Sequence, residues 1–105
     1  MVAWYTTESI AGKEIKQHIG VATGSTIRAR NIGRDIIAGL RTLVGGEVPE
    51  YTEMMAHARN QAVERMQVKA QEMGADAVVG VRFSTAMIMQ GTAEVMAFGT
   101  AVKFT

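Results

Sequence analysis

Side chains that could hold a metal ion are few in this sequence, which has two histidines and no cysteine. Glu53, His57 and Glu64 are separated by four and then seven positions, so they fall on roughly one side of a helix. Glu53 and His57 would supply two of the three or four ligands that a zinc site needs, and a neighbouring chain would have to complete the shell. The simpler interpretation, which we favour, is a solvent-exposed helix face that carries a stabilising Glu–His pair.

The other histidine and the eight methionines are weaker metal candidates. We expect His18 on the same strand face as Lys16 and Ala22, and the positive charge of Lys16 disfavours a bound cation. Thioethers favour soft ions such as Cu(I). However, the methionines recur on the apolar side of a predicted helix, where methionine fills gaps in a core. The sequence therefore predicts no cofactor, with a bound metal ion as an unproven alternative.

Arginines gather around the start of a predicted helix. Arg28 and Arg30 precede it, and Arg34 lies in its first turn. Asn31 is a suitable N-cap for the same helix. Free N–H groups and the helix dipole attract phosphate or carboxylate, and arginine adds paired donors, so these four residues form a candidate anion site. The interpretation that we prefer is a salt-bridge layer between subunits, with acidic partners among Asp35, Glu47 and Glu50.

Catalytic signatures are absent from the chain. It contains none of the patterns G-x-G-x-x-G, G-x-x-x-x-G-K-[ST], G-x-S-x-G or H-E-x-x-H. Asp35 and Asp76 are candidate carboxylates, yet neither has a histidine or a nucleophile close to it in sequence. We therefore predict that the protein is not an enzyme.

Positive and negative charges nearly balance in this 105-residue chain, which has 11 Lys+Arg and 10 Asp+Glu residues. A general nucleic-acid-binding protein would show a clear basic excess, so we expect no nucleic-acid partner. No apolar run approaches the roughly 18 residues of a membrane span, and the N-terminus lacks the segments of a secretory signal. We expect a single domain, residues 1–105, in the cytoplasm and without a membrane partner.

Hydropathy patterns in the first half predict a strand followed by a helix. Residues 13–21 alternate with a period of two, which is typical of a strand. We expect this strand to continue to Ile27, with Gly24 marking a turn or bulge. From Asn31 the apolar residues recur every three or four positions, which indicates a shorter helix that ends at the glycine pair 45–46.

The second half predicts a long helix and a β-hairpin. Pro49 suits the first helical position and Gly74 suits the stop, so the helix covers 25 residues and about 37 Å. The β-rich run at 77–83, the turn at 90–91 and the strand at 92–104 then indicate an antiparallel hairpin.

Together these elements predict a two-layer α+β domain, in which an antiparallel sheet of three or four strands lies under the long helix. That helix exceeds the roughly 30 Å width of a small domain, and the last strand is apolar on both faces. We therefore expect a homo-oligomer whose copies cover the second sheet face or extend the sheet, rather than a monomer whose helices cover both faces. The expected interface residues are Val95, Met96, Phe98 and Val102.

Several short runs of the sequence resemble a known family. The chain carries NIGRDI at 31–36, AGLR at 38–41 and VGG at 44–46, followed by YT at 51–52, AR at 58–59, GADAVVGVR at 74–82 and GTAV at 99–102. These runs, in this order and over nearly the whole chain, resemble the YbjQ-like family of small bacterial proteins, which is labelled a heavy-metal-binding domain. The resemblance implies a dodecin-like α+β subunit that assembles into a ring, a pentamer, with no known reaction. The usual soft-metal thiolates are missing from this chain, which departs from the label.

Overall fold

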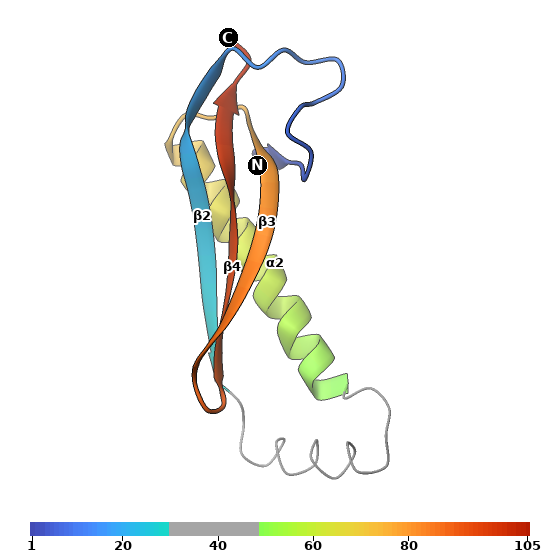
Figure 1. Ribbon diagram of the computed structural model, residues 1–105, viewed down its shortest axis with the longest axis vertical. Helices are drawn as coiled ribbons and strands as arrows, with labels where there is room; N and C mark the ends of the chain where they lie inside the picture. Colours follow the sequence, from blue (N-terminus) through green and yellow to red (C-terminus); the bar gives the residue numbers. More distant parts are fainter. Residues whose placement is uncertain (30–48) are drawn as a thin grey trace.

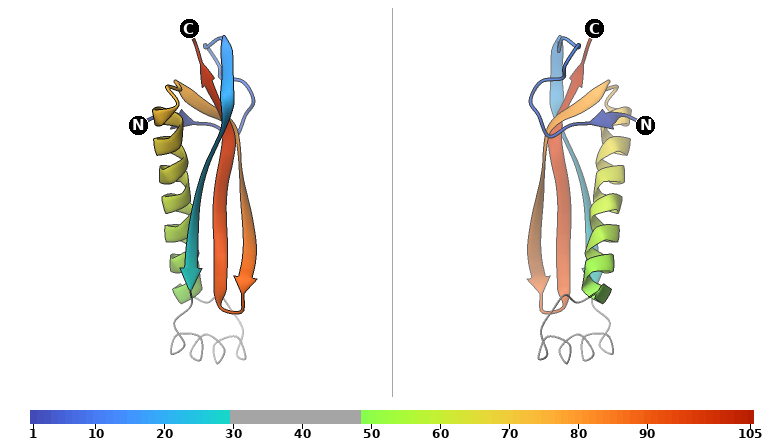
Figure 2. Two further views of the ribbon diagram at one scale, coloured as in Figure 1. Left: turned by 90° about the vertical axis from the view of Figure 1, so that its left-hand side faces the viewer. Right: turned by 90° about the vertical axis from the view of Figure 1, so that its right-hand side faces the viewer.

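The computed structural model describes residues 1–29 and 49–105 of the chain. In this part the elements are β1 (Ala3–Trp4), β2 (Gln17–Ala29), α2 (Pro49–Glu72), β3 (Ala77–Met89) and β4 (Thr92–Lys103). The strands form one sheet, and α2 lies along one of its faces (Figures 1 and 2). The predicted α+β class and the long helix are confirmed, whereas the shorter helix predicted from Asn31 lies outside the described residues.

The sheet is mixed, which corrects the prediction of an antiparallel sheet. Its order is β1-β3-β4-β2, and both β2 and β3 run antiparallel to β4. The short β1 pairs in parallel with the start of β3, through Ala3 with Ala77 and Trp4 with Val78. The chain then continues along β3, since the Tyr5 carbonyl accepts from the Val81 amide at 3.0 Å. A strand of two residues carries no periodicity, so hydropathy could not reveal it.

Helix α2 begins at the predicted residue and ends at Glu72, one residue before the predicted end. Pro49 is its first residue, a position where the missing N–H has no helical partner. Gly74 adopts a left-handed φ of +82° just beyond the helix. Its amide donates to the Gln71 carbonyl, and the Ala75 amide donates to the Ala70 carbonyl, both at 3.0 Å. These two bonds form a Schellman motif, which satisfies carbonyls that the helix end would leave free.

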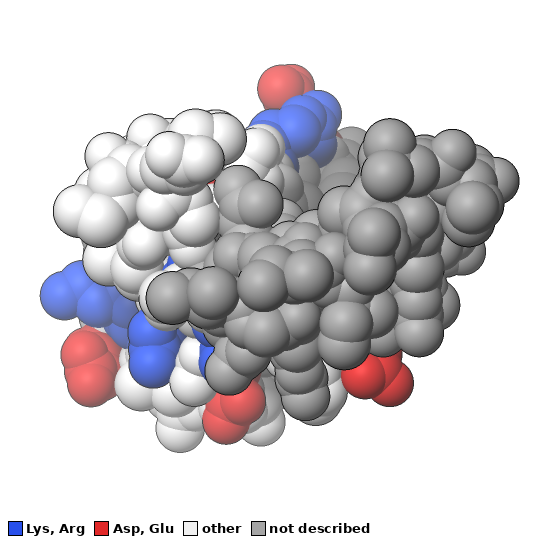
Figure 3. Space-filling view, turned by 90° about the horizontal axis from the view of Figure 1, so that it is seen from below, with Lys and Arg blue, Asp and Glu red and all other residues white. Residues whose placement is uncertain are grey.

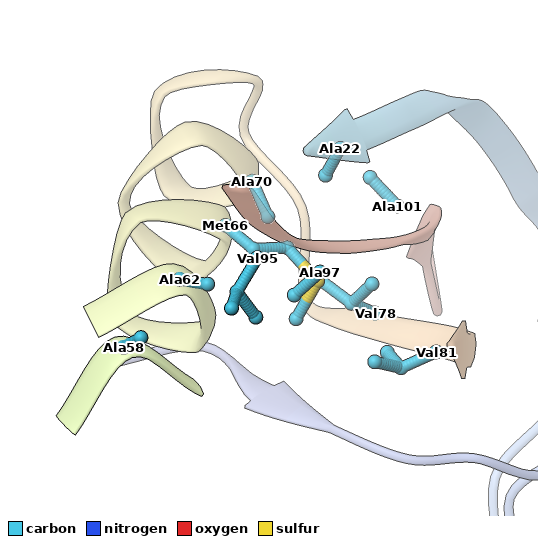
Figure 4. Packing of buried hydrophobic residues seen from close by; sticks show 10 residues of the cluster. All are labelled: Ala22, Ala58, Ala62, Met66, Ala70, Val78, Val81, Val95, Ala97 and Ala101. Carbon is cyan, nitrogen blue, oxygen red and sulfur yellow. The ribbon is translucent and has the colours of Figure 1, made fainter. Parts of the chain in front are cut away.

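The core lies between α2 and the small-residue face of β2 and β4. Four fully buried α2 residues recur every fourth position, namely Ala58, Ala62, Met66 and Ala70. They pack on buried sheet residues that include Ala22, Val95 and Ala97 (Figure 4). Side chains on α2 also bond β2, since Arg65 donates to the Ser25 carbonyl at 2.7 Å. Small residues on both sides bring the helix close to the sheet.

Gly24 is the point of closest approach between β2 and α2. A Cβ at this position would lie 2.2 Å from the backbone nitrogen of Met66 and 2.3 Å from the backbone oxygen of Ala62. The strand runs through Gly24 without a break, so the predicted turn or bulge there is wrong. The glycine serves packing, because only a residue without a side chain lets the helix backbone come this near.

Two β-bulges lie opposite each other across β4. In β2 the register shifts between His18 and Gly20, and in β3 it shifts between Val79 and Arg82. An extra residue changes the face on which the following residues lie. His18 pairs with Val102 and therefore lies on the face away from α2, whereas Ala22 is buried beneath the helix. The prediction that His18 and Ala22 share a face is wrong for this reason.

A smaller apolar cluster covers one end of the sheet on the face away from α2. Ala77, Val79 and Val102 are buried there, and Ile10, Ile15 and Phe104 pack against them. The Asp76 carboxylate holds the end of the chain over this cluster by accepting the Phe104 amide at 2.8 Å. Segments before β2 and after β4 therefore cover this part of the face within a single chain.

Thr26 is a buried polar residue with an unsatisfied hydroxyl. Its side chain is 3% exposed, and its Oγ1 has no hydrogen-bond partner. Replacing Thr26 by valine removes this unpaired group at similar size, so we expect the free energy of unfolding to rise by about 1 kcal/mol. Urea denaturation would show a higher midpoint with an unchanged slope. Thr23→Val, at an exposed position of the same strand, should change stability by less than about 0.5 kcal/mol, and an equal gain in both variants would contradict the expectation.

Candidate functional site

The outer half of β3 is the most exposed apolar segment of the described residues. Residues 82–89 are all exposed. The large apolar side chains among them keep 41% of their surface in solvent at Phe83, 71% at Met87, 52% at Ile88 and 63% at Met89. Helix α2 covers β2 and β4 and lies away from this strand (Figure 2). Exposed apolar side chains in one stretch mark a surface that a partner covers.

The four predicted interface residues divide into two groups. Val95 is 1% exposed beneath α2, and Val102 is fully buried in the second cluster, so the chain itself already covers both. Met96 and Phe98 are half-buried on the face away from α2, where Phe98 lies between Thr23 and Arg82. Within this set, Met96 and Phe98 alone offer side-chain surface to another molecule.

The residues predicted as metal ligands do not gather into a site. Glu53, His57 and Glu64 are exposed side chains on α2. Across residues 1–29 and 49–105, no group of three or more His, Cys, Asp or Glu side chains could hold a metal ion. The described residues of one chain therefore do not supply a complete set of ligands for a soft metal ion.

Arg28 is the one predicted anion-site residue that the structure describes, because Arg30, Asn31 and Arg34 lie outside the described residues. Its guanidinium donates from Nη2 to Gln61 Oε1 at 2.9 Å, while its Nε is buried without a hydrogen-bond partner. At this end of the molecule, basic and acidic side chains both appear among the described residues (Figure 3).

A hollow between the two bulges was missed by the sequence analysis. It has a volume of about 330 Å³ and is lined by Glu8, His18, Val79, Gly80 and Thr100. Glu8 comes from the segment before β2, His18 from β2 and Thr100 from β4. Ten positions separate Glu8 from His18, and Glu8 lies outside the strands, so spacing alone gave no signal that would join them.

Comparison with known proteins gives one consistent family. The YbjQ_1 family model, described as "Putative heavy-metal-binding", matches residues 2–105. A UPF0145 protein of Colwellia psychrerythraea is 58% identical over 98 residues, which cover 93% of each chain. A UPF0145 protein of Methanosarcina acetivorans is 57% identical over 98 residues, which cover 93% of this chain and 92% of that protein.

The fold also occurs in a solved structure. A protein of unknown function from Pediococcus pentosaceus, in the DUF74 family, superposes with a TM-score of 0.69 at 18% identity. The superposition covers 99% of this chain and 98% of that one. Within the described residues, no helix is long and apolar enough to cross a membrane.

Proposed function

This chain belongs to the YbjQ-like family, and from that premise we propose that it is a non-enzymatic protein that assembles with copies of itself into a ring. The observation that carries the proposal is the exposed segment 82–89 of β3, which carries four large exposed apolar side chains and lies at an open edge of the sheet. The short β1 pairs only with the first residues of β3, so this segment has β4 as its single partner among the described strands.

The dimensions of the elements also support assembly. Strands β2 and β3 have 13 residues each, and α2 has 24. At about 3.4 Å per strand residue, the strands extend about 44 Å. A small domain is roughly 30 Å wide, so elements of this length present more surface than one helix can cover.

The sheet topology favours a ring over an isolated pair. Strand β2 lies at one edge and the outer half of β3 at the other, and both run antiparallel to β4. They are therefore parallel to each other. Rotation about an axis along the strands would place β3 of one copy beside β2 of the next in parallel, and repeated head-to-tail contacts of this kind close into a ring. Five copies per ring is the number that the family resemblance implies.

Light scattering of the purified chain tests the assembly. We expect a mass near five times the 11.3 kDa of one chain. Ile88→Lys places a charge at the open edge and should shift the population toward single chains, because burying an unpaired charge between copies is costly. Val68→Lys is the matched control, since Val68 is 43% exposed and lies on α2 rather than on a strand. A wild-type mass of one chain would overturn the proposal, and disruption by Val68→Lys alone would move the interface to the helix.

Binding of a small anion where copies meet is the second candidate function. The observation that favours it is the buried Nε of Arg28, a donor that no protein group satisfies in the described part of the chain. A buried donor without a partner is costly, and an anion or a carboxylate of a neighbouring copy would satisfy it. Titration with inorganic phosphate tests this candidate.

A further inference from the structure

We propose that Met87 and Met89 form an oxidation-sensitive site, at which a peroxide converts both thioethers to sulfoxides and so stops the outer half of β3 from pairing with another copy. The inference rests on the proposed assembly, because it assigns a means of regulating the same edge of the sheet. Oxidation of the two residues and loss of assembly are measured separately.

Solvent exposure separates these two methionines from those of the core. Met87 is 71% exposed and Met89 is 63% exposed, whereas Met66 is fully buried. Met55 and Met73 are partly buried and pack against the core cluster. Because oxidation of a sulfur atom follows its exposure to the oxidant, we expect Met87 and Met89 to react before Met66.

The end of β3 presents one thioether on each face of the sheet. Met87 pairs with Ala93 and Met89 pairs with Thr92, across a register shift in β3. Since Ala93 and Thr92 are consecutive residues of β4, their side chains point to opposite faces, and those of Met87 and Met89 follow them. The edge beyond this segment is open among the described strands. A copy that pairs there would lie beside a thioether on both faces.

The modification is the transfer of one oxygen atom to sulfur. Hydrogen peroxide, supplied from outside the protein, loses its O–O bond as the S–O bond forms, and the remaining oxygen leaves as water. The sulfur is oxidised by two electrons and the peroxide is reduced by two. The product is a polar, chiral side chain in place of a flexible apolar one.

A sulfoxide at these positions opposes assembly and leaves the single chain folded. In the single chain both side chains are exposed, so water satisfies the new oxygen. When another copy covers the edge, the oxygen loses that water, and burying a polar group without a partner is costly. We therefore expect the concentration needed for assembly to rise at least about tenfold.

Treatment with hydrogen peroxide, followed by peptide mass spectrometry and light scattering, tests the site. At a dose that leaves Met66 unmodified, we expect sulfoxide at Met87 and Met89 and a fall in mass toward the 11.3 kDa of one chain. The double variant Met87→Leu with Met89→Leu cannot form these sulfoxides and should keep its mass. The matched control, Met55→Leu with Met73→Leu, removes two partly buried thioethers and should lose assembly as the wild type does.

A second double variant separates the sulfoxides from damage elsewhere in the chain. Met87→Gln with Met89→Gln places polar groups at both positions without any oxidant. We expect it to show the mass of a single chain together with the circular dichroism spectrum of the untreated wild type.

Three outcomes contradict the oxidation site. These are oxidation of Met66 while Met87 and Met89 stay unmodified, an unchanged ring mass with sulfoxide at both residues, and an equal loss of mass in the Met87→Leu, Met89→Leu variant. A ring that persists with both sulfoxides removes this inference alone. An untreated wild type with the mass of one chain removes the proposed assembly, and the regulation of assembly falls with it.

Discussion

Replacement of Gly24 by alanine is expected to lower the free energy of unfolding by about 3 kcal/mol. The added methyl group would overlap backbone atoms of α2, with Met66 N at 2.2 Å, Ala62 O at 2.3 Å and the carbonyl carbon of Arg65 at 2.8 Å. No side-chain rotation relieves these contacts, so α2 must move away from β2. A domain of this size is stable by only about 5–15 kcal/mol, and the loss is therefore a large fraction.

Urea denaturation followed by circular dichroism measures this loss. Gly91→Ala is the control, because Gly91 has a left-handed φ of +83° with open space around the position of a Cβ. It should cost about 1–2 kcal/mol from backbone conformation alone. In the double variant, Ala62→Gly should fail to restore stability, because the overlap is with the backbone at position 62. If Gly24→Ala costs no more than Gly91→Ala, the close approach of α2 to β2 is incorrect.

The contrast between Gly24 and Gly74 shows how far the sequence predicts the fold. Both ends of α2 follow from local chemistry, since Pro49 and Gly74 act on the backbone next to them. The hairpin turn at Gly91 is equally local. Gly24 has the same residue type but serves a contact with residues about 40 positions away. No local pattern distinguishes these two uses of glycine.

The candidate sites show the same limit. Spacing along one helix placed Glu53 and His57 near each other, yet both side chains are exposed on α2 without a third ligand among the described residues. Glu8 and His18 line one hollow only because a bulge shifts the register of β2 and the N-terminal segment pairs with β3. Bulges and pairing of a short strand arise from tertiary contacts, so strict alternation assigned His18 to the wrong face.

Two substitutions on opposite faces of β4 are expected to act differently, although both introduce a charge at a predicted interface position. Val95→Lys should unfold the chain. Val95 is 1% exposed within the cluster that α2 covers, and an unpaired ammonium there lacks both water and a partner. The cost of several kcal/mol is comparable to the whole stability of the domain.

Phe98→Asp should instead leave a folded chain that no longer assembles. Phe98 is half-buried on the opposite face, between the exposed residues Thr23 and Arg82. A carboxylate there stays in water in the single chain and loses that water only when another copy covers the face. Thermal unfolding by circular dichroism should show a cooperative transition for Phe98→Asp and none for Val95→Lys, and light scattering should give the mass of one chain for Phe98→Asp. Native stability in Val95→Lys would mean that α2 does not cover β4, whereas an unchanged ring mass in Phe98→Asp would place the contact between copies at the sheet edges alone.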